Sequence, residues 1–325
     1  MIILRKIAKI FLIALLCLIA LLTLVWGGLN LLKFAIYNDY YGIEESVCIN
    51  PGLGDGFVCQ GICVLEKEDP YNDKFEDLII VSGYMANGSA SRLYVTTLTN
   101  DSYFVSLKDA NGAEHNEHVG GVAVHQNTIY VVDDDAIHVL PLQYLLNAKN
   151  GDTLTFVEKI PVNNQASFIY AEDDYLWVGE FHNGNQYITN HPYDTPNGKN
   201  HAIVCRYSYS DLTKPNKIYS IIDKAQGFCY TPDKKIVFST SYGLADSVYY
   251  VFDDNDSYDS GLTLDGTPVY FLGEIEKQIS GPAMAEGLDL YNGKVITLTE
   301  SASNKYIFGK FFFANKIVAL DFNKD

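Results

Sequence analysis

Six polar residues stand at or just before the start of short apolar segments, and their side chains could share one ligand site. Glutamine amides bind ligands through hydrogen bonds, and a carboxylate or an imidazole can also transfer protons. Polar side chains that converge in a concave space form the usual binding site for a small molecule. The six residues are Gln60, His118, Gln165, Ser167, Gln226 and Glu286.

Among these residues, Glu286 and His118 are the candidates for acid–base catalysis, and Glu300 could support them from the end of a following strand. Glu286 is also the candidate ligand for a hard cation such as Ca²⁺, which accepts carboxylate and amide oxygens. One carboxylate among three glutamines gives a low ligand charge, so we expect such a site to bind calcium weakly. The chain has no G-x-S-x-G motif, which argues against a serine hydrolase.

The polar residues belong to a motif that recurs five times. A small residue opens each unit, and the steps between these residues are 60, 46, 60 and 60 positions; the five are Gly61, Gly121, Ser167, Gly227 and Gly287. A turn and a second strand follow, beginning at Leu78, Thr128, Tyr175, Lys235 and Lys294. A third strand begins near Ser91, Ala136, Ala202, Ser247 and Lys316, and some units show a fourth, as at Ser102 and Pro268.

The composition favours β-structure, with 24 Tyr and 17 Phe against only 3 Met. Units of three or four antiparallel strands that cannot bury both faces alone stack around an axis, so we predict an all-β fold, a β-propeller of five blades. Six blades are the fallback, and a β-sandwich is the alternative. We expect residues 46–50 to complete the last blade, and the first strand of each blade to line a central channel. The small opening residues would then allow close backbone contact near the axis.

The N-terminal region differs from the rest. Residues 10–26 are almost continuously apolar and follow Arg5, Lys6 and Lys9, which is typical of a transmembrane signal-anchor. A cleaved signal peptide is the alternative, although no small-x-small cleavage site follows. We therefore expect residues 1–36 to form a cytoplasmic tip and a single-pass membrane helix, and residues 37–325 to form a propeller on the extracytoplasmic side of the cell membrane.

The acidic surplus lies in the second part of the chain. Residues 37–325 contain 19 Lys and Arg against 40 Asp and Glu, a net charge of −21, which argues against nucleic acid as a partner. This part also contains five cysteines, an odd number. Cys48 and Cys59 flank a glycine-rich segment and are the pair that could form a disulfide, whereas Cys63 and Cys229 hold matching repeat positions and are expected in the core.

The openings QG, GG, QG and EG, followed by an apolar strand, a turn and a strand like VITLTES, resemble the broad propeller class that includes gluconolactonase, regucalcin-like lactonases and strictosidine synthase-like proteins. In those lactonases an opening glutamate is a metal ligand, and Glu286 occupies the matching position. The resemblance implies metal-assisted hydrolysis. Calcium-activated nucleotidases are also similar in having an anchor and five blades, but their axial sites are richer in carboxylates.

Three functions follow as expectations. The first is a membrane-anchored propeller that binds a small molecule or a surface polymer at the mouth of its channel. The second is a metal-assisted hydrolase of the lactonase or esterase type, with Glu286 or His118 taking part in the reaction. The third is a scaffold that presents a propeller face to another protein, in which substitution of either residue would have no effect on function.

Overall fold

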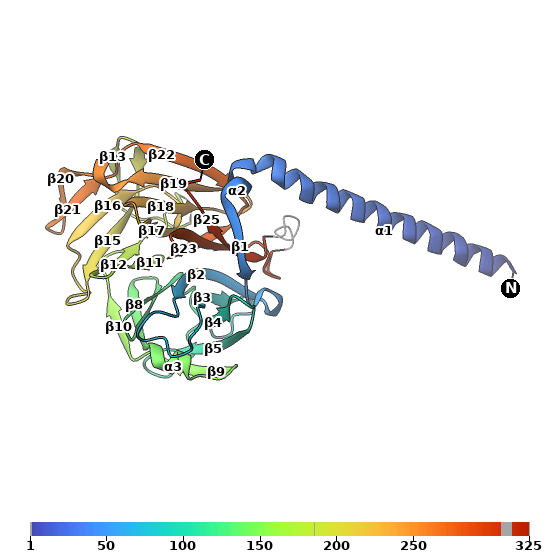
Figure 1. Cartoon of the computed structure of the whole chain (residues 1–325), viewed down its shortest axis with the longest axis horizontal. Coiled ribbons are helices and arrows are strands. Elements are labelled where there is room, and N and C mark those ends of the chain that lie inside the picture. The colour runs from blue at the N-terminus through green and yellow to red at the C-terminus, as the bar shows by residue number, and fades with distance from the viewer. Residues whose placement is uncertain (1, 185, 307–313, 325) are drawn as a thin grey trace.

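The computed structural model describes residues 2–184, 186–306 and 314–324. Five β-sheets stand around a central axis, and one long helix, α1 (Ile2–Ile36), leaves the body (Figure 1). The five-bladed propeller predicted from the repeat is therefore confirmed. Short elements outside the blades are α2 (Asn38–Ile43), α3 (Leu142–Leu146), two 3₁₀ turns (Leu53–Asp55 and Asp254–Asp256) and the hairpin of β13 (Tyr193–Thr195) and β14 (Gly198–Asn200).

The blades follow the repeats in chain order. Blade 1 comprises β2 (Phe57–Leu65), β3 (Leu78–Met85), β4 (Arg92–Thr97), β5 (Ser102–Lys108) and β9 (Asp152–Thr155). Blade 2 comprises β6 (Gly121–His125), β7 (Thr128–Asp133), β8 (Ala136–Pro141) and β10 (Glu158–Pro161). Blade 3 comprises β11 (Phe168–Ala171), β12 (Tyr175–Gly179), β15 (Ala202–Ser208), β16 (Lys217–Ile221), β20 (Tyr258–Leu264) and β21 (Thr267–Phe271).

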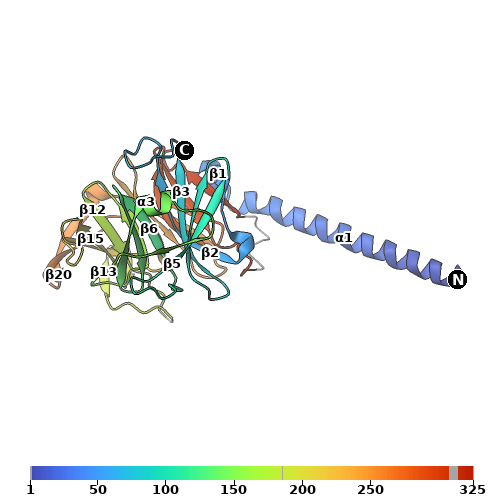
Figure 2. The ribbon, with the colours of Figure 1, turned by 90° about the horizontal axis from the view of Figure 1, so that it is seen from below.

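Blade 4 comprises β17 (Ala225–Tyr230), β18 (Lys235–Thr240), β19 (Ser247–Asp253) and β22 (Ile275–Gly281). Blade 5 comprises β23 (Ala285–Tyr291), β24 (Lys294–Thr299), β25 (Lys316–Leu320) and β1 (Glu44–Ile49). In Figure 2, which turns the molecule by 90°, the blades form a compact body with α1 to one side. Side chains on facing sheets bury continuous apolar clusters between the blades, which is how each sheet covers its two faces.

The opening glycines bring neighbouring inner strands together. A Cβ atom at Gly61 would lie 2.5 Å from the Cα of Gly121, and a Cβ at Gly227 would lie 2.7 Å from the backbone nitrogen of Leu288. A Cβ at Gly287 would come within 3.0 Å of the Cα of Gly61. The distances at Gly61 and Gly227 are shorter than real Cβ contacts, and the distance at Gly287 is tighter than nearly all of them. The role that the sequence indicated for these positions is therefore confirmed.

The propeller closes with the first strand of the chain in the last blade. β1 pairs antiparallel with β25, from Glu44 opposite Leu320 to Ile49 opposite Lys316. This pairing confirms the predicted closure by the segment just after the N-terminal helix. It also covers the outer edge of β25.

Two strands cross from one blade to the next. β9 pairs in parallel with β5, and β21 pairs in parallel with β16, so segments that follow a later blade extend an earlier one. The strand predicted near Pro268 exists, but it belongs to blade 3. Its expected assignment to the fourth unit was wrong, because β22 takes the outer position of blade 4 beside β19. The sequence pattern predicts that the strand exists but does not predict the strand with which it pairs.

The N-terminal helix is fixed to the propeller at its end. The Tyr37 hydroxyl donates a hydrogen bond to Asp246 at 2.6 Å. Tyr40, on α2, is 3% exposed and stacks on Tyr249 of β19, with 5.9 Å between ring centroids. Within the described chain, one helical segment, from Arg5 to Ile36, is long and apolar enough to cross a membrane, and a signal sequence would meet the same criterion.

The cysteines are all thiols. Cys48 and Cys59 are both buried but do not bond to each other, so the expected disulfide is wrong. Instead, the Cys59 thiol contacts the side-chain nitrogen of Asn50 at 3.0 Å and the carbonyl of Thr299 at 3.3 Å. Cys63 and Cys229 are buried at 4% and 0% exposure, as their repeat positions predicted.

Candidate functional site

The channel has an upper mouth, where the inner strands begin, and a lower mouth, where they end. At the upper mouth, the pairing of β2, β17 and β23 with their second strands skips one or two residues. The skipped residues include Gln60, Gln226 and Glu286. Such bulges turn a side chain away from the regular alternation of a strand. The sequence located these positions but did not predict the bulges.

Two predicted residues, Gln60 and Glu286, meet a third at this mouth. The Gln60 side-chain nitrogen donates a hydrogen bond to Glu300 Oε2 at 2.9 Å. Glu286 is 3% exposed and interacts electrostatically with Glu300, which lies just after β24. Two carboxylates therefore share one buried region with one glutamine amide. We call Gln60, Glu286 and Glu300 the mouth triad.

Burial gives these carboxylates a strong affinity for protons. It raises the pKa of Glu286 well above the usual value, and the neighbouring charge of Glu300 raises it further. Burial also raises the pKa of Glu300 to about 7, against the opposing effects of the Tyr306 hydroxyl, Lys305 and Gln60. A carboxylate pair of this kind holds a proton at neutral pH. The mouth triad can thus both donate and accept hydrogen bonds.

Aromatic and basic side chains surround the triad. Lys305 lies over the Tyr84 ring, 4.5 Å from its centroid, and the hydroxyls of Tyr84 and Tyr306 lie 3.5 Å apart. His118 is exposed and packs against Tyr84, with 4.3 Å between the ring centroids. His118 is therefore part of the rim at blade 1, and among the described residues no hydrogen bond joins it to the triad. Its role in ligand binding stays a prediction.

The blade 3 side of the mouth is held by Glu180, a fully buried carboxylate. Its oxygens accept hydrogen bonds from the backbone nitrogens of Gln165 and Ile203, and His191 lies 2.9 Å away. The Gln165 side chain is exposed, whereas Ser167 is half-buried and accepts a hydrogen bond from the backbone of Phe181 at 3.1 Å. Ser167 therefore supports the local backbone.

Gln226 lies on the blade 4 side of the mouth. Its side-chain nitrogen is 3.5 Å from the hydroxyl of Ser241, at the edge of hydrogen-bonding distance. The side chain is half-buried and keeps hydrogen-bonding capacity toward the channel. The neighbouring strand β18 is joined to blade 5 by the hydrogen bond from the Ser239 hydroxyl to the carbonyl of Glu286, at 2.6 Å.

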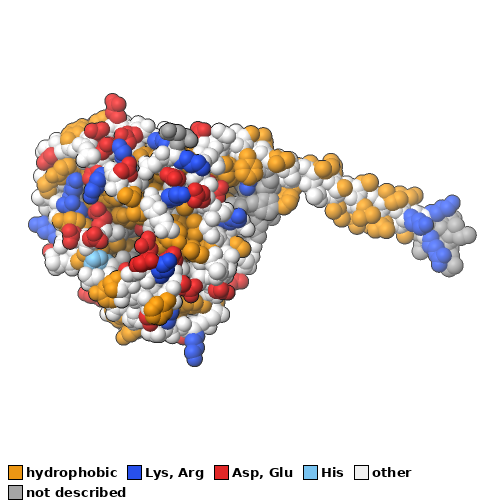
Figure 3. Space-filling view, in the orientation of Figure 1, with side chains coloured by type: hydrophobic (Ala, Val, Ile, Leu, Met, Phe, Trp, Pro, Cys, Tyr) orange, Lys and Arg blue, Asp and Glu red, His pale blue; other side chains and the backbone are white. Residues whose placement is uncertain are grey.

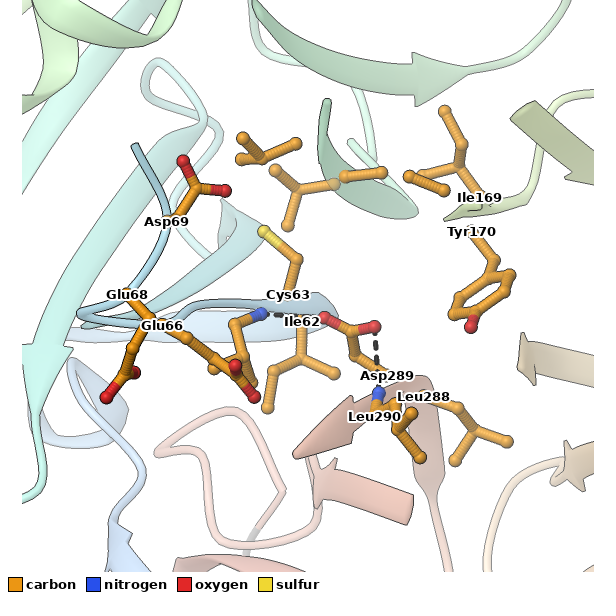
Figure 4. Close-up of a pocket in the computed structure, with 15 residues that line it drawn as sticks. Ile62, Cys63, Glu66, Glu68, Asp69, Ile169, Tyr170, Leu288, Asp289 and Leu290 are labelled. Carbon is orange, nitrogen blue, oxygen red and sulfur yellow. Dashed lines mark hydrogen bonds between the residues drawn. The ribbon is translucent and has the colours of Figure 1, made fainter. Parts of the chain in front are cut away.

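A separate cavity of about 420 Å³ opens toward the lower mouth (Figure 4). Four of the five inner strands line it, mostly with aliphatic side chains, and Tyr170 points into it. Asp289 accepts hydrogen bonds from the backbone nitrogens of Val64 at 2.7 Å and Leu290 at 2.8 Å. Burial, together with the charge of Glu66, raises the pKa of Asp289 to about 7. Glu66, Glu68 and Asp69 flank the cavity, so its electrostatics favour a cation over an anion.

The sequence reasoning missed several of these residues. Tyr84 lies at the end of the aligned second strand β3, where nothing in the repeat marked it as a site residue, and Lys305 and Tyr306 come from a loop that the repeat does not align. Asp289 did have a signal, because an acidic residue stands there in the fifth opening where two other openings have cysteine. The expected core position thus has a polar side chain in one blade only.

The described residues contain two groups of side chains whose ligand atoms lie close enough to hold a metal ion. One comprises Asp109, His115 and His138, and the other comprises His182, His201 and Asp223. Neither includes Glu286, whose role as a calcium ligand stays a prediction. Its nearest carboxylate is Glu300, and two oxygen donors are few for Ca²⁺.

The chain is similar to known structures only at low sequence identity. No protein-family profile and no curated sequence matches the chain. The chain is similar to the Dos1 propeller at 9% identity and a TM-score of 0.36, covering 77% of this chain and 54% of that one. It is also similar to a GH43_1 enzyme from Xanthomonas citri complexed with xylose, at 11% identity and a TM-score of 0.46, over 86% and 92% of the two chains.

BamB from Moraxella catarrhalis is a third similar structure, at 8% identity and a TM-score of 0.31, over 78% of this chain and 82% of that chain. Similarity at this level concerns the propeller architecture alone. No comparison supports the lactonase class in particular. The five blades of the structure confirm the propeller fold that the repeat openings implied.

Proposed function

We propose that this protein is a membrane-anchored β-propeller that binds a polyhydroxylated ligand, a sugar or a surface polysaccharide, at its upper mouth. The observation that carries the proposal is the hydrogen bond between Gln60 and Glu300 beside the buried Glu286. Amide and carboxyl groups that can donate and accept suit vicinal hydroxyls. The rings of Tyr84, Tyr306 and His118 provide flat apolar surfaces next to them.

Its placement at a membrane rests on α1. Figure 3 shows apolar side chains along this helix and basic side chains at its N-terminal tip, while acidic side chains are spread over the body. Basic residues at one end of a span favour the cytoplasmic side. We therefore propose that the propeller lies outside the cytoplasm, where surface polymers and small extracellular molecules would be its available ligands. A surface with a net charge of −21 also disfavours nucleic acid.

An oligosaccharide array tests this function. The full-length protein, purified in detergent, should bind a subset of neutral or acidic oligosaccharides, and Gln60→Ala and Glu300→Gln should each weaken that binding at least about tenfold, in line with the loss of one or two buried hydrogen bonds. Gln278→Ala, at an exposed position on β22, is the matched control and should bind as the wild type does. Binding that Gln60→Ala leaves unchanged would contradict the proposal.

A hydrolase is the second candidate, and the shared proton of Glu286 and Glu300 favours it. A protonated and an ionised carboxylate side by side provide a general acid and a general base. Turnover of p-nitrophenyl acetate or of a simple lactone should then fall at least about a hundredfold in Glu286→Gln, with folding intact. The exposed Glu274→Gln is the control. A scaffold that binds another protein elsewhere would be indifferent to both substitutions.

A further inference from the structure

A buried cluster of two histidines and one aspartate lies between blades 1 and 2, away from the mouth triad. His115 comes from the loop between β5 and β6, Asp133 ends β7 and His138 lies on β8. Their exposed fractions are 3%, 3% and 2%. Titratable groups that are buried this deeply need a hydrogen-bond or ion-pair partner for every polar atom.

The contact between His115 and Asp133 is short, but it is not a well-directed hydrogen bond. His115 Nε2 lies 2.6 Å from Asp133 Oδ2, yet neither atom has a hydrogen-bond partner among the described residues. At that distance the ring nitrogen and the carboxylate oxygen interact closely, but their direction does not suit a hydrogen bond. Two buried polar atoms this close need a positive centre that both can face, either a proton on Nε2 or a metal ion that both atoms bind.

The other contacts orient the same atoms. His115 Nδ1 lies 2.7 Å from Asp109 Oδ1, and a carboxylate that accepts the Nδ1 proton fixes the ring so that Nε2 carries the lone pair. His138 Nε2 lies 2.9 Å from the second oxygen of Asp133. Ligand atoms of His115, His138 and Asp109 lie within 4.8 Å of one another. A carboxylate that holds the far nitrogen of a ligating histidine is the usual arrangement around protein-bound zinc.

We propose that His115, His138 and Asp133 bind a divalent transition-metal ion, Zn²⁺ in the first place, with Asp109 as the positioning residue of His115. Two imidazoles and a carboxylate are the ligands that Zn²⁺ accepts, whereas Ca²⁺ and Mg²⁺ prefer oxygen alone. The ion would neutralise Asp133 and satisfy both atoms that lack partners.

This site would have a structural role. The Phe156 ring packs against both imidazoles, with 5.2 Å to the His115 centroid and 4.8 Å to that of His138, and shields them from solvent. The ion would join the loop that follows blade 1 to two strands of blade 2. That loop also carries His118, so the metal would help to hold one side of the upper mouth.

Metal analysis of the full-length protein in detergent tests the proposal. After removal of metal with a chelator and incubation with Zn²⁺, the wild type should retain about one equivalent by plasma mass spectrometry, and its melting temperature should rise. His115→Ala and His138→Ala should retain none. His201→Ala, in the second group of possible ligands, is the matched control and should keep the full equivalent.

Two further measurements cover variants that fail to fold. Co²⁺ added to the metal-free wild type should give the visible absorption of a low-coordinate nitrogen and oxygen site, and Asp109→Asn should keep the stoichiometry but weaken Zn²⁺ binding about 10–100-fold. A wild type that binds no metal and melts at the same temperature with and without chelator would overturn the proposal. In that case a proton on His115 Nε2, and not a metal ion, lies against Asp133 Oδ2. Metal that disappears only in His201→Ala would overturn it as well.

Discussion

Gln60 and Glu300 are 240 positions apart in the chain, yet the amide nitrogen of one lies 2.9 Å from a carboxylate oxygen of the other. Gln60 belongs to the first repeat and Glu300 to the fifth, so the contact exists only because the ring is closed. It holds one carboxylate of the mouth triad in place beside the second. The upper mouth is therefore formed by the meeting of the two ends of the propeller.

Glu300→Gln should change how stability depends on pH. Glu300 has a pKa of about 7 in the folded protein against a usual value of 4.5, so between these values the folded state holds more protons than the unfolded state. The free energy of unfolding therefore falls as pH rises from about 4.5 to about 7. Glu300→Gln should remove part of this fall, and stability at pH 8 should increase by on the order of 1–2 kcal/mol after allowance for solvent screening at this half-buried group.

Urea titrations of both proteins at pH 5 and pH 8 measure the effect. Asp289→Asn should act in the same direction, since the pKa of Asp289 is also raised to about 7. The exposed Glu274→Gln should leave the pH profile unchanged. A Glu300→Gln protein that keeps the full wild-type pH dependence would show that this carboxylate is ionised without cost in the fold.

Gly61→Ala should destabilise the propeller. The new methyl group would lie 2.5 Å from the Cα of Gly121 and 2.6 Å from the backbone nitrogen of Val122, and backbone atoms there cannot move independently. We expect a loss of about 1–3 kcal/mol, as for other overpacked cores. Gly54→Ala is the control, because nothing lies within 4 Å of its added carbon. Equal denaturation midpoints for the two variants would contradict the close approach of blades 1 and 2.

The buried thiols should not react with a thiol reagent in the native state, and all thiols should react after unfolding. Five cysteines are buried, and burial raises the pKa of Cys48 to about 11, which removes the reactive thiolate. Ellman's reagent should detect none of these five in the folded protein and all six cysteines in guanidinium chloride without reductant. A count of four after unfolding would restore the disulfide between Cys48 and Cys59.

Tyr40→Ala should release the N-terminal helix from the propeller. Tyr40 covers Gly281, whose added Cβ would come within 2.8 Å of the ring, and stacks on Tyr249. Loss of the buried ring should lower the free energy of unfolding by about 3–5 kcal/mol. Limited proteolysis should then cut between α1 and the blades sooner than in the wild type. Tyr144→Ala, at a site that is 56% exposed, is the control and should be cut at the wild-type rate.

Local sequence patterns predicted the fold well because each blade begins with the same order of small residue, strand, turn and strand. The opening small residue, the turn and the second strand recur in every unit, so the number of blades and the inner position of β2, β6, β11, β17 and β23 followed from the spacing. The sequence did not predict which strand an outer strand pairs with. β21 has the alternation of any edge strand, and its pairing with β16 depends on the path of the connection, which periodicity does not encode.

The site residues, too, could be predicted only where they occupy a position that the repeat aligns. Gln60, Gln226 and Glu286 were found because they occupy equivalent positions beside the opening residue. Glu300 was found at the end of a second strand, but its raised pKa depends on burial that the sequence does not show. Lys305 and Tyr306 lie on an irregular loop, so no repeat position indicated these two residues. The histidine cluster was not predicted for the same reason. His115 lies between two blades, and only the packing of those blades brings it close to Asp133.

The pairing of β1 with β25 makes the two ends of the polypeptide a single structural seam. During synthesis β1 is made first, directly behind the helix, and it must wait for the last strand before it has a partner. Until β25 has been made, both strand edges of this seam are exposed, and closure of the ring waits for the last blade. A chain cut short before β25 would therefore leave β1 as an open edge with which other chains could pair.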